Sequence, residues 1–164
     1  MNWAVAIKTS VSVFWCPPFS SLKLNVDGAC KGNPGVGGGG GIIRNTEGRV
    51  IAAFANFYGE CTNSIANLRV LRDGLKLCES LGIKDFHVNS DSAATVQCIA
   101  KRKCEFWKGW YWFQEVLGLI NFLKPMISFT YREGNRAAGF LANLACDSKK
   151  DTVFHGESSL HQNL

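Results

Sequence analysis

The sequence lacks any pair of cysteines at the spacing of a zinc ribbon or a dithiol redox motif. Its seven cysteines stand singly along 164 residues, and no Cys-x-x-Cys pattern occurs. An odd number of scattered cysteines is typical of reduced thiols in an intracellular protein. We therefore expect an intracellular protein, in the nucleus or the cytoplasm, and not a secreted one.

An apolar run of membrane-spanning length is also missing. Met1–Trp15 is apolar, but Lys8 interrupts it, and Cys16–Pro18 follows where a signal peptide would carry small residues at its cleavage site. We expect residues 1–21 to form an N-terminal arm or linker. No membrane partner is expected.

Acidic residues are scarcer than basic ones. The chain has 13 Asp and Glu against 18 Lys and Arg, a formal net charge of +5, which favours a polyanionic partner. With 46% hydrophobic residues, no internal repeat and this length, the chain is large enough for one domain with its own core. We expect a monomer.

The stretch Lys23–Gly35 carries the first pattern with chemical content. Leu24 and Val26 alternate with Asn25 and Asp27, which predicts a strand with an apolar face and a polar face that holds a carboxylate. The glycines and proline of residues 32–35 then favour a tight turn. A carboxylate on a strand beside such a turn is more often a solvated strand end than a metal ligand, so its meaning depends on the rest of the chain.

Strands and helices alternate in the remaining pattern. Two strands are expected at 37–44 and 49–58, and the later elements are helix 62–82, strand 86–90, helix 93–100, a helix ending near residue 123, strand 127–131 and helix 136–146. The helix between the third and fourth strands predicts a crossover, so that strand 86–90 pairs in parallel with the first strand. Residues 147–164 are polar with little periodicity and are expected to be disordered.

Four short motifs occur in an order that a known family shares: Asn25–Ala29, Gly32–Gly35, Asn89–Ser92 and Tyr131–Arg136. Through these motifs the chain resembles the ribonuclease H family, and most closely the RNase H-like domains of plant retrotransposon polyproteins, the reverse-transcriptase-associated type. The resemblance covers roughly residues 23–145. Residues 15–18 resemble the segment that joins this domain to upstream reverse-transcriptase modules, which implies a retrotransposon-derived protein.

The resemblance implies an α/β fold, an RNase H-like mixed five-stranded sheet. Three strands would be antiparallel and two further strands parallel, with helices on both faces. It divides the chain into an N-terminal arm or linker at 1–21, an RNase H-like domain at 22–146 and the polar tail at 147–164.

The family's activity is endonucleolytic cleavage of the RNA strand of RNA–DNA hybrids by two magnesium ions, which four carboxylates hold. Mg²⁺ prefers carboxylate oxygens, and two such ions can activate the attacking water and stabilise the leaving oxygen. By resemblance, Asp27 and Asp91 match two of the four metal-binding and catalytic positions. Asn67 stands where the family has Glu, and Gly139 where it has Asp.

Neighbouring carboxylates do not replace the two that are missing. Asp73 lies six residues after position 67, about 240° around the helix, and Asp147 lies eight residues after position 139, about 12 Å along its helix. Asn67 offers only a neutral oxygen, and Gly139 offers no side chain. We therefore expect at most one weakly held Mg²⁺.

Residues for nucleic-acid binding are better preserved than the metal ligands. By resemblance, the contacts to the hybrid would come from Cys30, Asn33, Asn63 and Ser64. Lys31, Arg132 and Arg136 add cations in reach of its phosphates, and Asn135 is assigned to the same interface, where it would orient groups near the last helix. Turn formation or helix capping is the alternative explanation for each residue taken singly.

A basic and aromatic stretch lies between the second and third expected helices. Lys101, Arg102 and Lys103 precede Trp107 and Trp110, and cations mixed with aromatic rings are typical of nucleic-acid grooves. The alternative is a solvated basic turn before a helix whose aromatic residues, Phe106, Trp110 and Phe113, pack on the sheet. Aromatic residues at helical spacing are more often part of a core.

The sequence therefore predicts an RNase H-type domain that binds nucleic acid, an RNA–DNA hybrid, with Mg²⁺-dependent cleavage weak or lost. Two alternatives stay open. One is an active hybrid ribonuclease in which Asn67 partly replaces the missing Glu. The other is a retroelement relic without a function.

Overall fold

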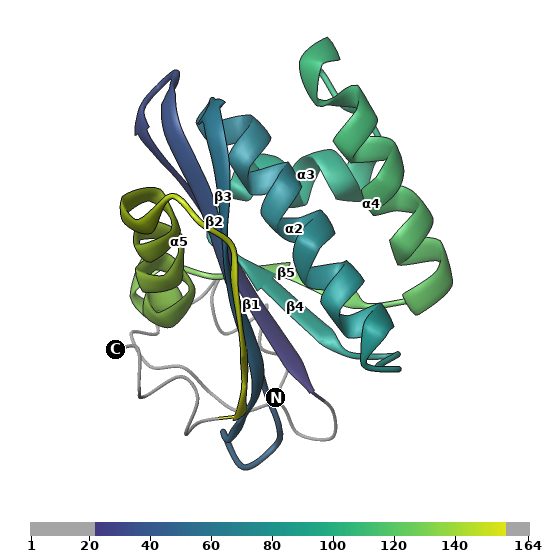
Figure 1. The fold of residues 1–164 in the computed structure, drawn as a ribbon. Coiled ribbons are helices and arrows are strands. Elements are labelled where there is room, and N and C mark those ends of the chain that lie inside the picture. Colours follow the sequence, from purple (N-terminus) through teal and green to yellow (C-terminus); the bar gives the residue numbers. More distant parts are fainter. Residues whose placement is uncertain (1–21, 157–164) are drawn as a thin grey trace.

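The computed structural model describes residues 22–156, and Figure 1 shows a twisted sheet with helices on both faces. The predicted arm at 1–21, with its Trp15–Pro18 segment, and residues 157–164 lie outside the described residues. The elements are β1 (Lys23–Gly32), β2 (Gly35–Arg44), β3 (Val50–Cys61), α2 (Asn63–Ser80), β4 (His87–Ser90), α3 (Ala93–Lys101), the short 3-10 helix η1 (Trp107–Gly109), α4 (Trp110–Leu123), β5 (Met126–Phe129), the 3-10 helix η2 (Arg132–Asn135), α5 (Arg136–Ser148) and β6 (Thr152–His155).

The strands follow the order β5-β4-β1-β2-β3-β6. β1, β2 and β3 form an antiparallel meander, and β4 pairs in parallel with β1 and with β5. The predicted crossover is thus confirmed: the chain leaves the meander through α2 and returns on the far side of β1.

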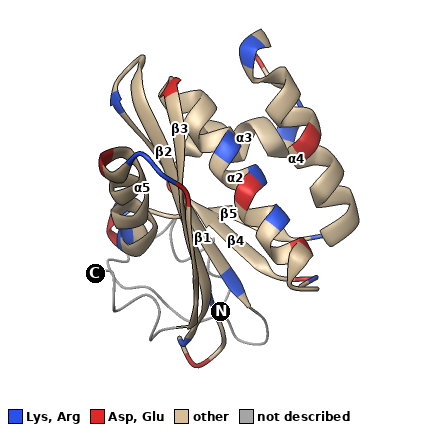
Figure 2. Ribbon diagram, in the orientation of Figure 1, with Lys and Arg blue, Asp and Glu red and all other residues tan. Residues whose placement is uncertain are grey.

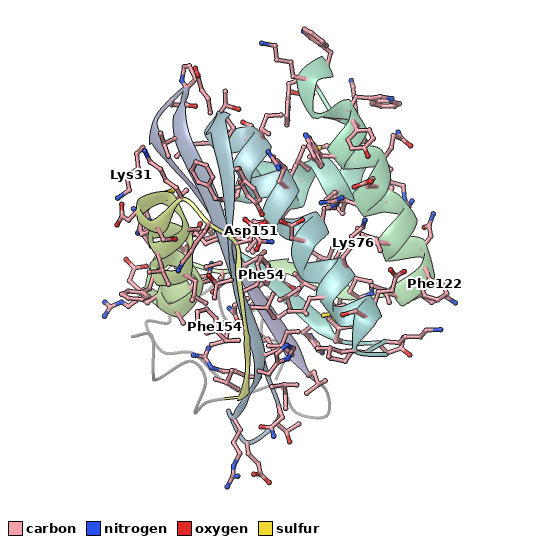
Figure 3. The ribbon with its side chains drawn as sticks, in the orientation of Figure 1. Lys31, Phe54, Lys76, Phe122, Asp151 and Phe154 are labelled. Carbon is pink, nitrogen blue, oxygen red and sulfur yellow. The ribbon has the colours of Figure 1, made fainter. Side chains whose placement is uncertain are left out.

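The sheet contains one strand more than the sequence predicts. β6 comes from the polar stretch expected to be disordered and pairs antiparallel with β3, with Phe154 opposite Ala53. Phe154, labelled in Figure 3, is 1% exposed. It packs in a small core with Leu141 of α5. The expectation of disorder is therefore wrong for β6, because one buried aromatic ring is enough to anchor a four-residue edge strand in a polar segment.

Helix α5 covers one face of the sheet and lies directly on β2. We call β2 the glycine strand, because its residues 37–41 are all glycine. A Cβ at Gly40 would lie 2.4 Å from the Ala138 carbonyl oxygen, and one at Gly38 would lie 3.0 Å from the Ala142 carbonyl oxygen. The main chains of β2 and α5 therefore touch without side chains between them. This contact sets how close the helix comes to the sheet.

The opposite face carries α2, α3 and α4 (Figure 1). Leu24 and Val26 of β1 are fully buried there against Gly74 of α2, as the alternation predicts. An ion pair of 2.6 Å from Arg72 Nε to Glu115 joins α2 to α4. Within residues 22–156, no helix has both the length and the apolar character needed to cross a bilayer.

Candidate carboxylate pair and nucleic-acid interface

Asp27 and Asp91 lie side by side because of the parallel pairing of β1 and β4. Val26 is opposite Ser90 in this register, so the next residue on each strand reaches the same edge of the sheet. The two carboxyl groups are hydrogen-bonded to each other. The structure thus brings together the two aspartates that the sequence singled out.

Burial is the largest cause of the pKa shifts of both aspartates. Burial, the nearby charge of Asp91 and their hydrogen bond raise the pKa of Asp27 to about 8. Burial also raises the pKa of Asp91, while the Arg132 guanidinium lowers the pKa of both groups. Like charges on two neighbouring buried carboxyl groups resist joint ionisation, so the pair holds one proton between them at neutral pH.

Asn67 stands beside the pair, but its side-chain oxygen is already engaged. Asn67 Oδ1 accepts the Gly28 N–H at 3.1 Å, and its amide nitrogen donates to the Asn63 carbonyl at 3.0 Å. The first turn of α2 rests on β1 itself, since a Cβ at Gly28 would lie 2.6 Å from the Asn67 backbone nitrogen. Asn67 therefore braces the α2–β1 contact.

Gly139 faces the same pair from α5. A Cβ built on Gly139 would lie 3.0 Å from Asp27 Oδ2. A carboxylate at this position would therefore point at Asp27. All four positions matched to the family's carboxylates converge on one place, although only two of them carry a carboxylate.

This set of donors suits one divalent ion better than two. Among the described residues, no group of three or more His, Cys, Asp and Glu side chains is placed to hold a metal ion. Two carboxylates that share a proton, with an amide oxygen already bonded to Gly28, supply little of the negative charge that Mg²⁺ needs to give up its water. The residues present would therefore offer Mg²⁺ fewer charged ligands than the four carboxylates of the family.

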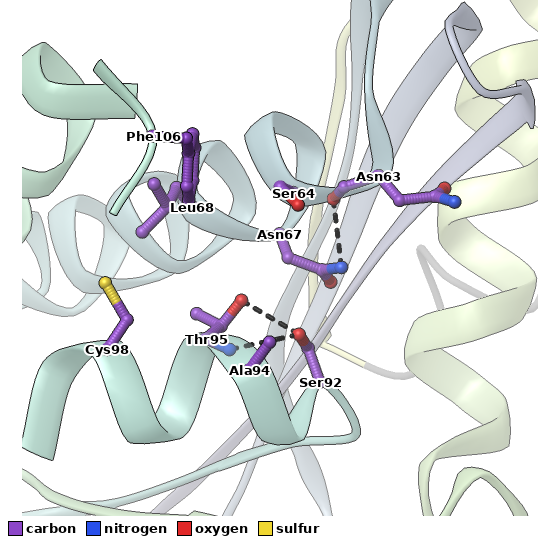
Figure 4. Close-up of a pocket in the computed structure, with 9 residues that line it drawn as sticks. All are labelled: Asn63, Ser64, Asn67, Leu68, Ser92, Ala94, Thr95, Cys98 and Phe106. Atoms are coloured by element: carbon purple, nitrogen blue, oxygen red, sulfur yellow. Dashed lines mark hydrogen bonds between the residues drawn. The ribbon is translucent and has the colours of Figure 1, made fainter. Parts of the chain in front are cut away.

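A groove leads away from the carboxylate pair between α2 and α3. Three adjoining hollows of about 240, 390 and 190 Å³ all have Ser64 and Phe106 in their walls. We call them together the Ser64–Phe106 groove. Figure 4 shows the first hollow, where Asn67 and Ser64 of α2 face Ser92 and Thr95 of α3. Because Asn67 borders both, the groove begins at the carboxylate site.

Comparison with known proteins gives the family. A family model described as reverse transcriptase-like matches residues 25–145. The chain belongs to this ribonuclease H-like family.

Individual relatives agree. The chain is 26% identical over 136 residues to the "Putative ribonuclease H protein" of Arabidopsis thaliana, covering 76% of this chain and 20% of that protein. It is 36% identical over 91 residues to ribonuclease H of Syntrophomonas wolfei, covering 54% of this chain and 60% of that protein. It thus spans less than two thirds of the length of either relative.

A solved structure matches the fold. LC11-RNase H1, determined in complex with an RNA/DNA hybrid, superposes with a TM-score of 0.73 at 23% identity, covering 78% of this chain and 98% of that one. The ribonuclease H-like fold expected from the motifs is thus confirmed. The sixth strand, β6, is the difference from the five-stranded sheet that the resemblance implies.

In this ribonuclease H-like domain, several of the residues predicted to bind nucleic acid gather at the groove. Asn33 and Ser64 line it, and Asn33 Oδ1 accepts the Asn63 N–H at 3.1 Å, which ties the β1–β2 turn to the start of α2. Lys101 and Lys103 line its third hollow. Figure 2 marks the charged residues on the ribbon.

Other predicted residues lie elsewhere on the surface or have partners. Lys31, labelled in Figure 3, lies at the surface. It forms an exposed ion pair of 2.9 Å with Asp147 at the end of α5. Cys30 Sγ donates to the Cys61 carbonyl at 2.9 Å. Arg102 and Arg136 are exposed, while Arg132 lies beside the carboxylate pair and not in the groove.

Asn135 is inside the protein, so the expected contact with a hybrid is not open to it. It is 2% exposed, its amide nitrogen donates to the Val26 carbonyl at 2.8 Å, and its oxygen accepts from Asn25 at 3.0 Å. It fastens the start of α5 to β1 next to Asp27. Asn135 can be buried because its side-chain amide bonds one main-chain group and one side-chain group at the same time.

The aromatic stretch is divided between the core and the surface. Phe113 is 1% exposed and Phe106 is half-buried, as packing on the core predicts, but Trp110 is 55% exposed. Sequence reasoning missed the role of Arg69. Its guanidinium lies 4.3 Å from the Tyr58 ring centroid and 4.6 Å from that of Trp112. This stacking holds α4 against α2 and β3.

Proposed function

We propose that this ribonuclease H-like domain binds RNA–DNA hybrids and that its cleavage of them is weak or lost. Hybrid binding is supported by the groove, which begins beside the carboxylate site at Asn67 and carries amides, hydroxyls and lysines. A structure of the same fold, LC11-RNase H1, holds an RNA/DNA hybrid. Such a mixture of groups suits a sugar-phosphate backbone.

Weak or lost cleavage is supported by one observation above all: Gly139 faces Asp27 with no side chain. Asn67 adds a second deficit, because its oxygen is bonded to Gly28. Mg²⁺, when bound, would supply an activated water and a stabilised leaving oxygen. Asp27 and Asp91 would hold a single ion, and Arg132 would pair with a phosphate.

A labelled hybrid tests both halves of the proposal. Binding is measured by fluorescence polarisation in EDTA, and cleavage is followed on a gel with Mg²⁺ and then Mn²⁺. We expect binding that weakens with salt and cleavage no faster than that of the Asp27→Asn variant. Cleavage by wild type that Asp27→Asn abolishes would establish an active ribonuclease instead.

The relic hypothesis has its own test, which is the unfolding transition. Among the described side chains, the only buried nitrogen or oxygen without a hydrogen-bond partner is Arg69 Nε. The other buried polar side-chain atoms of this region all have partners, as in a stable folded protein. We expect one cooperative thermal transition. A broad, non-cooperative change would favour the relic.

Three further expectations belong to this proposal. The protein acts as a monomer, it works inside the cell, and it is a retrotransposon-derived domain of the plant type. All six cysteines among residues 22–156 are free thiols, which suits a reducing compartment. Sedimentation and imaging of a tagged full chain would test the first two.

A further inference from the structure

Three aromatic side chains of η1 and the first turn of α4 are exposed to solvent. Trp107, Trp110 and Tyr111 are 81%, 55% and 60% exposed. The neighbouring ring fills the interior in their place: Phe106 packs on Gly109 so closely that a Cβ there would lie 2.1 Å from the ring. The core therefore does not require Trp107. An exposed cluster of large rings is a common mark of a binding surface.

Trp107 is also part of the Ser64–Phe106 groove. With Lys108 and Asn33 it borders the hollow of about 390 Å³, and Lys108 Nζ lies 5.7 Å from the Trp107 ring centroid. Lys101 and Lys103 line the adjoining hollow, where Glu105 is the one acidic residue. The indole therefore stands in a mainly positive setting, which fits a polyanion better than an apolar protein segment.

We propose that Trp107 is a stacking surface for an unpaired nucleobase, in a strand that continues beyond the hybrid. Inside a duplex, neighbouring base pairs cover the faces of each base, so only an unpaired or terminal base is free to lie on an indole ring. This inference rests on the proposed hybrid binding. It adds that the preferred ligand is a hybrid with a single-stranded extension.

The test compares a blunt hybrid with hybrids of the same paired length that carry a short extension at one of the four strand ends. Wild type is expected to bind at least one extended hybrid about five- to tenfold more tightly than the blunt one. Trp107→Ala should lower the affinity for the extended hybrid by more than it lowers the affinity for the blunt hybrid, and so remove this difference. Trp107→Phe, which keeps a ring, should retain most of it.

Phe122→Ala is the matched control. Phe122 is 55% exposed and lies at the other end of α4 (Figure 3), so its removal should leave both affinities unchanged. Thermal unfolding of each variant verifies that the fold is retained.

Each outcome decides a different question. Equal affinities of wild type for blunt and extended hybrids would overturn the stacking site and leave hybrid binding intact, with a protein partner as the remaining occupant of the rings. An equal loss for both ligands in Trp107→Ala would also overturn it, because the ring would then contact the duplex. Binding of neither ligand by wild type would overturn the proposed function itself.

Discussion

Asp27 is the residue on which the electrostatics of the site depend. It is held in a buried strand next to a second carboxylate, and the Arg132 guanidinium offsets the effect on its pKa only in part. The folded protein therefore keeps a proton on Asp27 that the unfolded chain loses. The difference in bound protons makes the free energy of unfolding depend on pH, and the direction of that dependence can be measured.

We predict that stability decreases as pH rises, and that Asp27→Asn removes this decrease. The folded pKa of Asp27 is raised to about 8, so between about pH 4 and pH 8 the native state binds the extra proton. The free energy of unfolding should then fall by up to about 1.4 kcal/mol per pH unit in that window. Urea denaturation at several pH values measures it.

Asp85→Asn is the control for this series, since Asp85 is exposed and lies at the surface. Its profile should follow that of wild type. A slope in Asp27→Asn as steep as in wild type would show that other groups cause the pH dependence.

The two replaced positions allow a test by restoration. Asn67→Glu combined with Gly139→Asp should restore Mg²⁺-dependent hybrid cleavage, because both side chains would face Asp27. Mg²⁺ should also stabilise the double variant by about 2–3 kcal/mol at a concentration about 100-fold above its dissociation constant. Differential scanning calorimetry with and without Mg²⁺ measures this.

The matched control is Asn67→Gln with Gly139→Asn, which changes the size of the side chains without adding charge. It should show neither cleavage nor stabilisation by Mg²⁺. A folded charged variant that stays inert would mean that more than two functional groups had been lost.

At the scale of elements, β2 and α5 meet main chain against main chain. Gly40→Ala should destabilise the protein by about 1–3 kcal/mol, because the new methyl group would overlap the Ala138 carbonyl and the helix must shift. Gly118→Ala is the matched control: a Cβ there meets nothing within 4 Å, and it lies inside α4. It should stabilise by about 0.5–1 kcal/mol. Urea titration of both variants should show shifts of opposite sign.

How far the sequence predicts these elements depends on what each one contacts. The apolar stripe of α2 and the alternation of β1 are local patterns, so the amino-acid sequence alone reveals them. The glycine run predicts a strand, but it does not identify α5 as the partner that requires small residues. β6 has a single buried ring, and its only signal is Phe154 in a polar segment.

The site follows the same rule. The resemblance singles out Asp27 and Asp91, and the predicted crossover places the ends of their parallel strands at one edge of the sheet. The burial of Asn135 depends on β1, which is distant in sequence, and no local pattern reveals it. The exposure of Trp110 likewise depends on how α4 is rotated against α2, which the spacing of the aromatic residues leaves open.

At the scale of the whole molecule, basic residues gathered at one end of α3 should dominate the salt dependence of hybrid binding. Replacing Lys101, Arg102 and Lys103 together by alanine should lower the slope of log affinity against log salt by roughly 0.7–0.9 for each phosphate that the variant no longer neutralises. Fluorescence polarisation over a range of potassium chloride concentrations measures the slope.

Lys84→Ala is the control, because Lys84 lies over the Phe122 ring at the other end of α4. It should leave the slope unchanged. An unchanged slope in the triple variant would mean that the hybrid lies along another face of the domain.

The main-chain contact between α5 and the glycine strand also has an evolutionary consequence. The glycines of β2 let α5 lie close to the sheet, and a Cβ at position 139 meets only Asp27 Oδ2 within 4 Å, so an acid introduced there would not require the scaffold to be rebuilt. Under the proposed loss of cleavage, substitutions at two positions are enough to restore activity, because the framework that carries both positions is retained.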